Sequence, residues 1–507
     1  MTASFSAVRP RPGEPGWQPL VLRRWFPRVR LIPQRLLRLP RITTTGLVLT
    51  FLALQFLIPA RLVIRGMGAV GRPAVAVGLL LAFFWVLSTL RPRGLPAGRQ
   101  PVRWLLGIYL VVQAIGYAIG MDRVPVPVEV SAGDRFMIMI VAMVGLAMAM
   151  ADGIRDRQEL DRILRFLIGV ATAMALVGIL QYFRLVDLTQ YIRIPGLIPN
   201  YDLLGPGSRG DIGLARVAGT ANHYIEFGVV LALVLPLALH YALYAPSRRA
   251  ARWAWFQAGI IVAAIPMSIS RSAILTVVVG GLLLASAWKW RLRYNAAVIA
   301  LVAATALHLL TRGLFGTILG LFRNVDDDPS IQNRLSDQPQ VWNLWSQRPV
   351  FGRGVGMIIP ERYLLIDNEF FVTLIAGGIV GVLAFLALFF VPYLMARSLR
   401  LRSPLERDRH LGQALAAALP AACVAAFTFD ALSFATYTGL LFVLIGAVGA
   451  FWRLQREAGV GPQLRPLTWS PEDRYLAAPL AARDHPRWRD PLLAPQPGPR
   501  RARTTPR

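Results

Sequence analysis

A single arginine interrupts a long apolar stretch of the chain. Arg271 lies in the segment MSISRSAIL and is the only charged residue between Trp253 and Trp288. The alternation of basic connections along the chain places this residue on the outer face of the membrane, where an arginine departs from the positive-inside bias. One explanation is an arginine that snorkels to the phosphates of the lipids and takes no part in chemistry.

A second group of polar residues precedes an apolar segment in ARVAGTANHYIEF. His223 and Glu226 are three residues apart and would share one face of a helix, and both are side chains that accept protons, so both are candidate general bases. The alternative is structural: Thr220 or Asn222 caps the helix, and Glu226 complements the helix dipole. Capping alone does not account for Arg216 beside His223.

A third group ends a polar stretch that reads RPVFGRGVGMIIPERYLLIDNEFF. GRGVG lacks the last glycine of a dinucleotide fingerprint, so a turn is expected there. Asp367 is a candidate base, and Asp367 or Asn368 is also suited to cap the helix that follows. Gly377 and Gly381 have the spacing of a face that packs against another membrane helix.

The sequence predicts neither a metal site nor a cofactor site. Asp326, Asp327 and Asp328 precede a proline in a pattern typical of a solvated turn, and the five histidines lack the spacing of metal ligands. Cys423 is the only cysteine, which excludes an intrachain disulfide and a thiolate cluster. Lys289 is the only lysine, so a P-loop lysine outside the membrane is also excluded.

Composition indicates which elements must position these residues. The chain has 507 residues, is 55% hydrophobic and only 16% charged, and has a mean hydropathy of +0.49, which is typical of an integral membrane protein. Its formal charge of +28, from 55 basic and 27 acidic residues, is therefore expected to mark cytoplasmic loops rather than a nucleic-acid surface.

The hydropathy pattern predicts an all-α fold, a polytopic bundle of about twelve transmembrane helices, because a bilayer core needs about 20 apolar residues per helix. The apolar run from Trp253 to Trp288 is too long for one helix, and Pro266 predicts a hairpin with Arg271 at its tip. The expected spans are Thr44–Ala60, Pro73–Leu90, Trp104–Gly120, Phe136–Ala151, Ile163–Phe183, Tyr224–Tyr244, Trp253–Ser268, Ser272–Trp288, Asn295–Thr311, Phe370–Ala396, Gln413–Phe429 and Ala431–Trp452.

Basic residues are concentrated in alternate connections, which predicts the orientation of the bundle. The two longer extracytoplasmic loops are expected at 184–223 and 312–368, whereas Arg61, Arg65 and Arg72 make the first outer loop an exception. The expected cytoplasmic connections are 91–103, 152–162, 247–252, 289–293 and 396–409.

Both termini are expected to be cytoplasmic. Residues 1–43 form a basic N-terminal tail without the pattern of a cleaved signal peptide, 44–452 form the transmembrane bundle, and 453–507 form a Pro/Arg-rich tail predicted to be disordered.

These segments together resemble the O-antigen ligase and Wzy-type polysaccharide polymerase superfamily of bacterial membrane glycosyltransferases. The family has an R-x-x-G-T segment before a helix, an S-R pair at a hairpin tip, a P-x-x-G-x-G stretch, and a His-Asn or Asp-Asn pair that opens the next helix. The residues that carry the resemblance are Arg216, Gly219, Thr220, Ser270, Arg271, Pro349, Gly352, Gly354, Asp367 and Asn368. Asp367 stands where a histidine is frequent in the ligase branch.

The resemblance implies an enzyme of the bacterial inner membrane that acts on glycans linked to undecaprenyl diphosphate, with a glycan or glycolipid as acceptor. Arg216 and Arg271 would hold the diphosphate, with Arg334 or Arg353 assisting from the loop. Asp367, His223 or Glu226 would accept the proton of the attacking hydroxyl group, and no metal would be needed. Polysaccharide export or chain-length-control proteins are the expected protein partners.

Two other classes of protein fit some of these features. A polysaccharide or lipid-linked glycan flippase would also use outer arginines, but transporters commonly carry ionisable groups at the bilayer midplane, where this chain has almost none. A membrane scaffold with basic tails that bind anionic lipid leaves the outer loops without a role. The sequence does not distinguish ligase from polymerase and does not identify the sugar.

Overall fold

The computed structural model describes residues 43–90, 100–200, 207–209, 214–311, 313–314, 316–318, 337–360, 362–363 and 365–459. Residues 1–42 and 460–507 of the predicted tails, the aspartates at 326–328 and Arg334 lie outside the described residues. The start of the predicted C-terminal tail, up to Glu457, is helical and continues the last helix, because the hydrogen bonds of that helix extend beyond its apolar part. Most of the described residues are helical, as the sequence predicts, and the helices belong to a compact unit that begins at Thr44.

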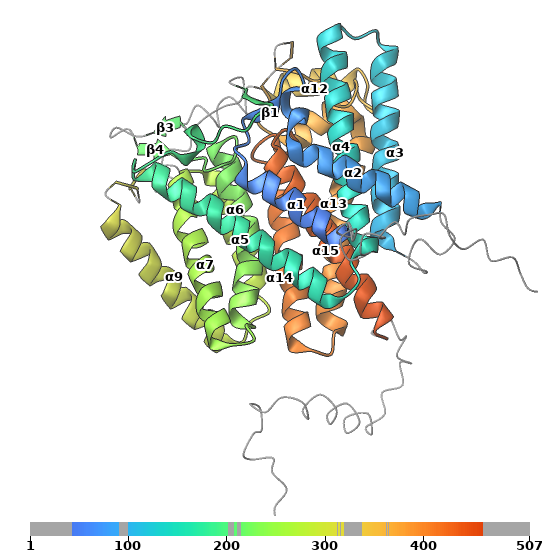
Figure 1. The fold of residues 1–507 in the computed structure, drawn as a ribbon. Helices are drawn as coiled ribbons and strands as arrows, with labels where there is room; N and C mark the ends of the chain where they lie inside the picture. The colour runs from blue at the N-terminus through green and yellow to red at the C-terminus, as the bar shows by residue number, and fades with distance from the viewer. Residues whose placement is uncertain are drawn as a thin grey trace, which may run out of the picture. The chain divides into compact units, whose positions relative to one another are not determined.

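The α-helices follow one another along the chain, with longer connections between α5 and α6 and between α9 and α13 (Figure 1). Their bounds are α1 Thr44–Leu57, α2 Pro73–Thr89, α3 Pro101–Asp122, α4 Pro127–Gly153, α5 Arg157–Tyr182, α6 Tyr224–Leu243, α7 Arg248–Ala264, α8 Arg271–Ala285, α9 Trp290–Leu310, α12 Gln338–Ser346, α13 Glu369–Arg402, α14 Glu406–Ala426 and α15 Ala435–Glu457.

Short strands and 3-10 turns form the connections at one end of the helices, which is the upper end in Figure 1 and is called the loop end below. Four three-residue strands, which the all-α prediction did not include, form two antiparallel pairs, β1 with β2 and β3 with β4. The bounds are β1 Leu62–Ile64, β2 Leu197–Pro199, β3 Gly207–Arg209, β4 Leu214–Arg216, η1 Gly68–Gly71, η2 Leu188–Gln190, η3 Ile265–Ser268 and η4 Ala431–Ser433.

Six of the described helices are long and apolar enough to cross a membrane: α3, α4, α5, α6, α13 and α15. Three more, α1, α2 and α8, are apolar but shorter. Each of the twelve predicted spans contains a helix, but the number of helices that cross the membrane stays a prediction.

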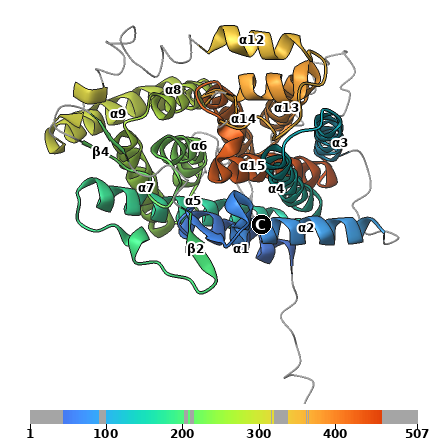
Figure 2. The same ribbon diagram turned by 90° about the horizontal axis from the view of Figure 1, so that it is seen from above.

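Helix α15 lies at the centre of the packing, together with α6 (Figure 2). Every residue of α15 from Ala435 to Phe451 is buried, and nearly all of α6 is buried as well. A helix that is apolar on every side must be surrounded by protein or lipid, and the neighbours of α15 include α4, α6, α13 and α14. The polar residues at the starts of α6 and α15 are consequently held in a fixed frame.

The apolar run from Trp253 to Trp288 folds as the predicted hairpin. Helix α7 ends at Ala264, η3 follows, and Ile269 adopts a left-handed conformation with φ of 47° and ψ of 48°. Ser270 then caps α8 by accepting a hydrogen bond from the amide of Ala273 at 3.4 Å. Arg271 is therefore the first residue of α8, immediately beyond the turn.

Helix α13 is broken near its start, at Gly378. This residue has φ of 63° and ψ of −162°, a backbone conformation that is essentially restricted to glycine. A Cβ atom at this position would overlap the carbonyl group of Val350. The break lies between Gly377 and Gly381, which the sequence predicts to form a helix-packing face. A Cβ atom added at Gly377 would instead find no other atom within 4 Å, and both glycines line a cavity.

The segment Pro349–Gly354 satisfies the backbone groups that the break in α13 leaves without helical partners. The amides of Arg353 and Gly354 donate to the carbonyls of Ile375 and Ala376 at 2.9 and 3.0 Å. In the opposite direction, the amides of Ile379 and Val380 donate to the carbonyls of Pro349 and Val350 at 3.0 and 3.2 Å. A break in an apolar helix is tolerated when other backbone groups replace the lost hydrogen bonds in this way.

The same loop is held against α3 and α4 by a buried ion pair. Arg123 and Glu129 are 3.1 Å apart, and the side chain of Arg123 also donates to the carbonyl of Arg353 at 2.5 Å. The hydroxyl group of Tyr363 donates to Glu129 at 2.7 Å. These contacts attach the second long connection to the α3–α4 hairpin as well as to α13.

Two neighbouring glycines test the role of the break. Gly378→Ala should destabilise the protein by about 1–3 kcal/mol, because an L side chain is strained at this φ and would collide with Val350. Gly377→Ala should leave stability unchanged or raise it by about 0.5–1 kcal/mol, because its Cβ meets open space. Thermal unfolding of both variants in the same detergent measures the difference. Equal melting temperatures would contradict a required left-handed glycine at 378.

Candidate functional site

Arg216 ends strand β4 and reaches across to the α7–α8 hairpin. One terminal nitrogen of its guanidinium group donates to the hydroxyl group of Tyr224 at 2.5 Å, and the other donates to the carbonyl of Ile269 at 3.2 Å. The guanidinium carbon also lies 4.1 Å from the centre of the Tyr224 ring. The side chain of Arg216 therefore connects strand β4, helix α6 and the α7–α8 hairpin.

Arg271 follows Ile269 by two residues, so the structure brings the two predicted diphosphate-binding arginines to the same corner of the loop end. Its side chain is half-buried, and its backbone belongs to the first turn of α8. The free N–H groups of a helix start carry partial positive charge, which favours an anion at this position.

His223 is the residue that caps α6, a role that the sequence offered to Thr220 or Asn222. Its Nδ1 atom accepts a hydrogen bond from the amide of Ile225 at 3.3 Å, so the neutral ring carries its proton on Nε2. Burial, and secondly the charge of Arg216, lower the pKa of His223 to about 4. The ring is therefore neutral at pH 7 and offers an N–H donor rather than a free basic nitrogen.

Glu226 is fully buried and joins two helix starts. Its carboxylate accepts from the amide of Asn222 at 2.9 Å, and from the amides of Thr436 and Tyr437 at 2.6 and 3.3 Å. A carboxylate with three backbone donors is stabilised in its charged form and has no exposed edge for a substrate hydroxyl group. The geometry therefore favours a structural role, a clamp between α6 and α15.

Arg72 was not identified as a site residue, although its loop departs from the expected charge pattern. It immediately precedes α2, and its side chain is 5% exposed. Its Nε and one terminal nitrogen are buried without a hydrogen-bond partner among the described residues. Burial lowers the pKa of Arg72, and the negative charge of Glu226 opposes this effect. A buried cation thus lies within electrostatic range of the α6–α15 clamp.

Helix α13 begins with three polar residues that have three different environments. Asn368 is the cap, and its side-chain oxygen accepts from the amides of Phe370 and Phe371 at 2.9 and 3.4 Å. Asp367 is half-buried and is not needed for capping. Glu369 is 3% exposed and accepts from the hydroxyl group of Thr373 at 3.1 Å and from the amide of Leu432 at 2.8 Å.

Asp430 is a second residue that was not identified from the sequence. It precedes η4, in the connection between α14 and α15, and the carbonyl of its neighbour Phe429 accepts a hydrogen bond from the amide of Glu369 at 3.1 Å. Burial raises the pKa of Asp430 to about 7; a bond from Ser433 opposes the rise, and the charge of Asp367 adds to it. The sequence did contain a signal for this residue, because Asp430 is a single acidic residue between two predicted apolar spans.

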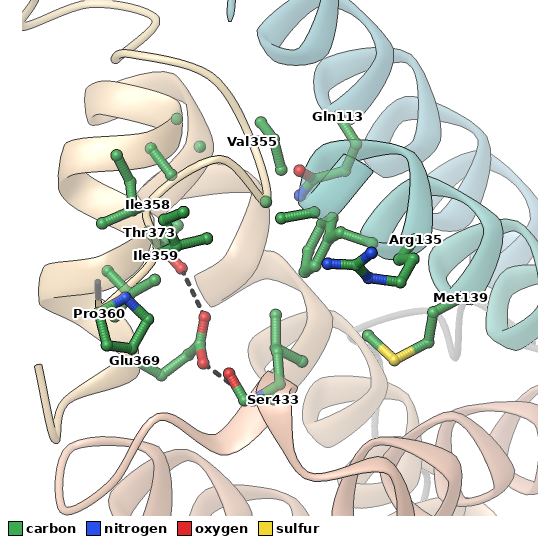
Figure 3. Close-up of a pocket in the computed structure, with 18 of the residues that line it drawn as sticks. Gln113, Arg135, Met139, Val355, Ile358, Ile359, Pro360, Glu369, Thr373 and Ser433 are labelled. Atoms are coloured by element: carbon green, nitrogen blue, oxygen red, sulfur yellow. Dashed lines mark hydrogen bonds between the residues drawn. The ribbon is translucent and has the colours of Figure 1, made fainter. Parts of the chain in front are cut away.

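A cavity of about 270 Å³ adjoins these acids, enclosed by α3, α4, α13, η4 and the loop around Val355 (Figure 3). Its polar lining residues are Gln113, Arg135, Glu369, Thr373 and Ser433, and the remaining walls are mostly apolar. Figure 3 shows Arg135 and Glu369 on different walls of this cavity. Neither was identified as a binding residue from the sequence.

The two other predicted diphosphate-binding residues are Arg353 and Arg334. Arg353 belongs to the loop that pairs with α13, and its side chain donates to Gln347 at 2.6 Å. Arg334 is outside the described residues. Among the residues that the structure describes, no group of three or more His, Cys, Asp or Glu side chains is close enough together to hold a metal ion.

Phe434 lies close to both regions. Its ring centre is 5.8 Å from that of His223, and the two residues that precede it in the chain, Leu432 and Ser433, line the cavity. The loop end therefore contains two adjacent regions, one with Arg216 and Arg271 and one with carboxyl groups around an enclosed space.

One segment of the chain matches a known family model. Residues 256–386 match the model of the family described as O-Antigen ligase, a segment that runs from α7 through the hairpin and the second long connection to the broken part of α13. A comparison with curated proteins gave no match. The matched segment includes the S-R pair, the P-x-x-G-x-G stretch and the Asp-Asn pair. Residues 256–386 therefore support the resemblance to the O-antigen ligase and Wzy-type polymerase superfamily, and the apolar helices indicate a multi-pass membrane protein.

Proposed function

We propose that the chain is a glycosyltransferase that transfers or polymerises glycan from an undecaprenyl-diphosphate donor at the extracytoplasmic face of the bacterial inner membrane. The product belongs to exopolysaccharide, capsule or cell-envelope glycan synthesis, and both chain termini are cytoplasmic. The family match supports the class of reaction, because the matching family is described as O-antigen ligase. The acceptor is a glycan or glycolipid, and export or chain-length-control proteins are expected partners.

The observation that carries the proposal is the contact between Arg216 and the carbonyl of Ile269, two residues before Arg271. The side chain of Arg216 thereby contacts the turn that leads into Arg271, a residue more than 50 positions later in the sequence. Guanidinium groups bind the oxygens of a diphosphate with paired, charge-assisted hydrogen bonds. Arg72, with two buried nitrogens that have no partner among the described residues, adds a further positive charge near Glu226.

The reaction makes one bond and breaks one bond. The acceptor hydroxyl oxygen attacks the anomeric carbon of the donor sugar, and the bond from that carbon to the diphosphate breaks. Undecaprenyl diphosphate leaves with the electron pair, and the hydroxyl proton passes to a carboxylate. Arginines aimed at the leaving diphosphate stabilise the negative charge that develops there, so we propose a mechanism without a metal ion.

Asp367 is the base that the geometry favours among the three candidates. His223 uses Nδ1 to cap α6, and Glu226 uses its carboxylate to bind three backbone amides. Asp367 is half-buried, leaves capping to Asn368 and interacts with Asp430, which has a pKa of about 7. A carboxyl pair of this kind retains a proton acceptor at neutral pH and provides a place for the transferred proton.

Arg271→Lys tests the diphosphate role. The variant should fold normally and lose about 10²–10³-fold in transfer rate, because lysine keeps the charge but not the paired donors. Transfer and release of free undecaprenyl diphosphate are measured with purified protein in EDTA, and Arg193→Lys in an exposed loop position serves as the matched control. Full activity of Arg271→Lys would remove the diphosphate role. Movement of donor across vesicles without release of the diphosphate would instead identify a flippase.

Asp367→Asn tests the base. Asparagine keeps the shape of the side chain, and the α13 cap is Asn368, so the helix should start normally while transfer falls by about 10²–10⁴-fold. His223→Ala and Glu226→Gln are assayed in parallel. Both should lower the melting temperature more than they lower the rate of the folded protein. A folded Asp367→Asn variant with near wild-type turnover would exclude Asp367 as the base.

Asp430→Asn tests the coupled carboxyl pair through stability. The folded-state pKa of Asp430 is raised to about 7, so its contribution to stability is complete below about pH 4 and is lost as the pH rises through 7. The asparagine variant avoids this loss and should gain about 2 kcal/mol on wild type between pH 5 and pH 8. Thermal unfolding at several pH values measures the gain. Parallel curves for the two proteins would show that Asp430 does not carry a raised pKa.

A further inference from the structure

We propose that the cavity between α3, α4, α13 and η4 binds the acceptor sugar, in an inference that rests on the glycosyl-transfer function proposed above. Its volume of about 270 Å³ is close to the lower end of the range for small-molecule sites, enough for one sugar residue.

The lining of the cavity suits a sugar ring. Apolar walls formed by residues such as Phe136, Val355 and Pro360 can pack against the C–H faces of the ring. Polar groups are few and come from separate elements, so they can contact hydroxyl groups on different edges. Gln113, Arg135, Glu369, Thr373 and Ser433 are these polar groups.

Arg135 and Glu369 are the two ionisable side chains that line the cavity, on different walls (Figure 3). Arg135 donates to the hydroxyl group of Ser131 at 2.6 Å and forms no ion pair among the residues that the structure describes, which leaves further donors for a ligand. Each oxygen of the Glu369 carboxylate accepts one protein hydrogen bond and has capacity for another. Within the described part of the chain, neither side chain forms a salt bridge with a group of opposite charge.

The position of the cavity favours the acceptor over the donor. The donor diphosphate is assigned to Arg216 and Arg271, which are not among the residues that line the cavity. The carboxyl groups lie on the cavity side: Glu369 lines the space, and Asp367 is two residues earlier on the chain. Because the acceptor hydroxyl must meet the base while the donor phosphate must meet the arginines, the carboxyl side is the acceptor side.

The cavity can be filled without disturbing the backbone around it. Gly377 lines the space, lies outside the left-handed region, and would place a Cβ atom where nothing lies within 4 Å. Leucine at 377 therefore occupies the cavity and improves the local helix propensity. Gly281 in α8 also has no atoms within 4 Å of its Cβ position but is exposed and distant in sequence from the cavity-lining residues, so Gly281→Leu is the matched control.

The experiment measures transfer from undecaprenyl-diphosphate glycan to the surface glycan purified from cells that lack this gene, with each substrate titrated separately. Gly377→Leu should raise the KM for the acceptor by about tenfold or more, leave the KM for the donor unchanged, and melt at or above the wild-type temperature. Gly281→Leu should match wild type in all three measurements. An unchanged acceptor KM in folded Gly377→Leu would overturn the acceptor-site proposal.

A second pair of variants keeps the proposal open to refutation if leucine at 377 perturbs the fold. Arg135→Gln should raise the acceptor KM, whereas Arg65→Gln at an exposed position of the first loop should not. A larger rise in donor KM than in acceptor KM for Arg135→Gln would assign the cavity to the donor and refute the proposal. Absence of transfer by wild-type protein would refute the proposed function itself, a result distinct from active variants with an unaltered acceptor KM.

Discussion

The exchange of backbone hydrogen bonds between broken helix α13 and the segment Pro349–Gly354 holds the candidate site together. The break at Gly378 leaves carbonyl and amide groups without helical partners in a largely apolar region, and the loop satisfies both kinds of group. An unsatisfied backbone group costs several kcal/mol in such surroundings, so the loop and the helix start can separate only at high cost. Asp367 and Glu369 lie at one end of this unit, and Val355 and Gly356, which line the cavity, lie at the other.

Two carboxyl groups at the loop end, those of Glu226 and Asp430, have different environments. Glu226 is buried with three backbone amides, and the partial positive charges of two helix starts balance it in place of a direct ion pair. Asp430 has fewer donors, and burial keeps its pKa near 7. The backbone donors around Glu226 suit a structural role, whereas a carboxyl group that titrates near neutral pH can exchange a proton at little cost. This difference supports the proposal that Asp367 and Asp430, rather than Glu226, take part in proton transfer.

The sequence predicted the positions of the helices well, but it did not predict the tertiary contacts of individual polar side chains. Hydropathy located the helices, and Pro266 located the α7–α8 hairpin, because both depend on local composition. The spacing of Gly377 and Gly381 predicted helix packing, whereas the break between them turns both toward a cavity, a result of tertiary backbone contacts that spacing does not encode. His223 caps α6 in place of a more usual Thr220 or Asn222, and Arg72, Arg135 and Asp430 acquire their surroundings only from distant helices.

The P-x-x-G-x-G stretch shows how a family motif can be necessary without contacting substrate. Gly352 and Gly354 both have positive φ, and a Cβ at Gly352 would overlap the backbone of Ala376. Gly354 likewise lies against the backbone of Gly120 in α3. The glycines therefore allow three backbones to approach closely, and this approach forms the wall of the cavity at Val355. Variation in the side chains around that wall can change which sugar is accepted, while the backbone exchange that supports the base remains the same.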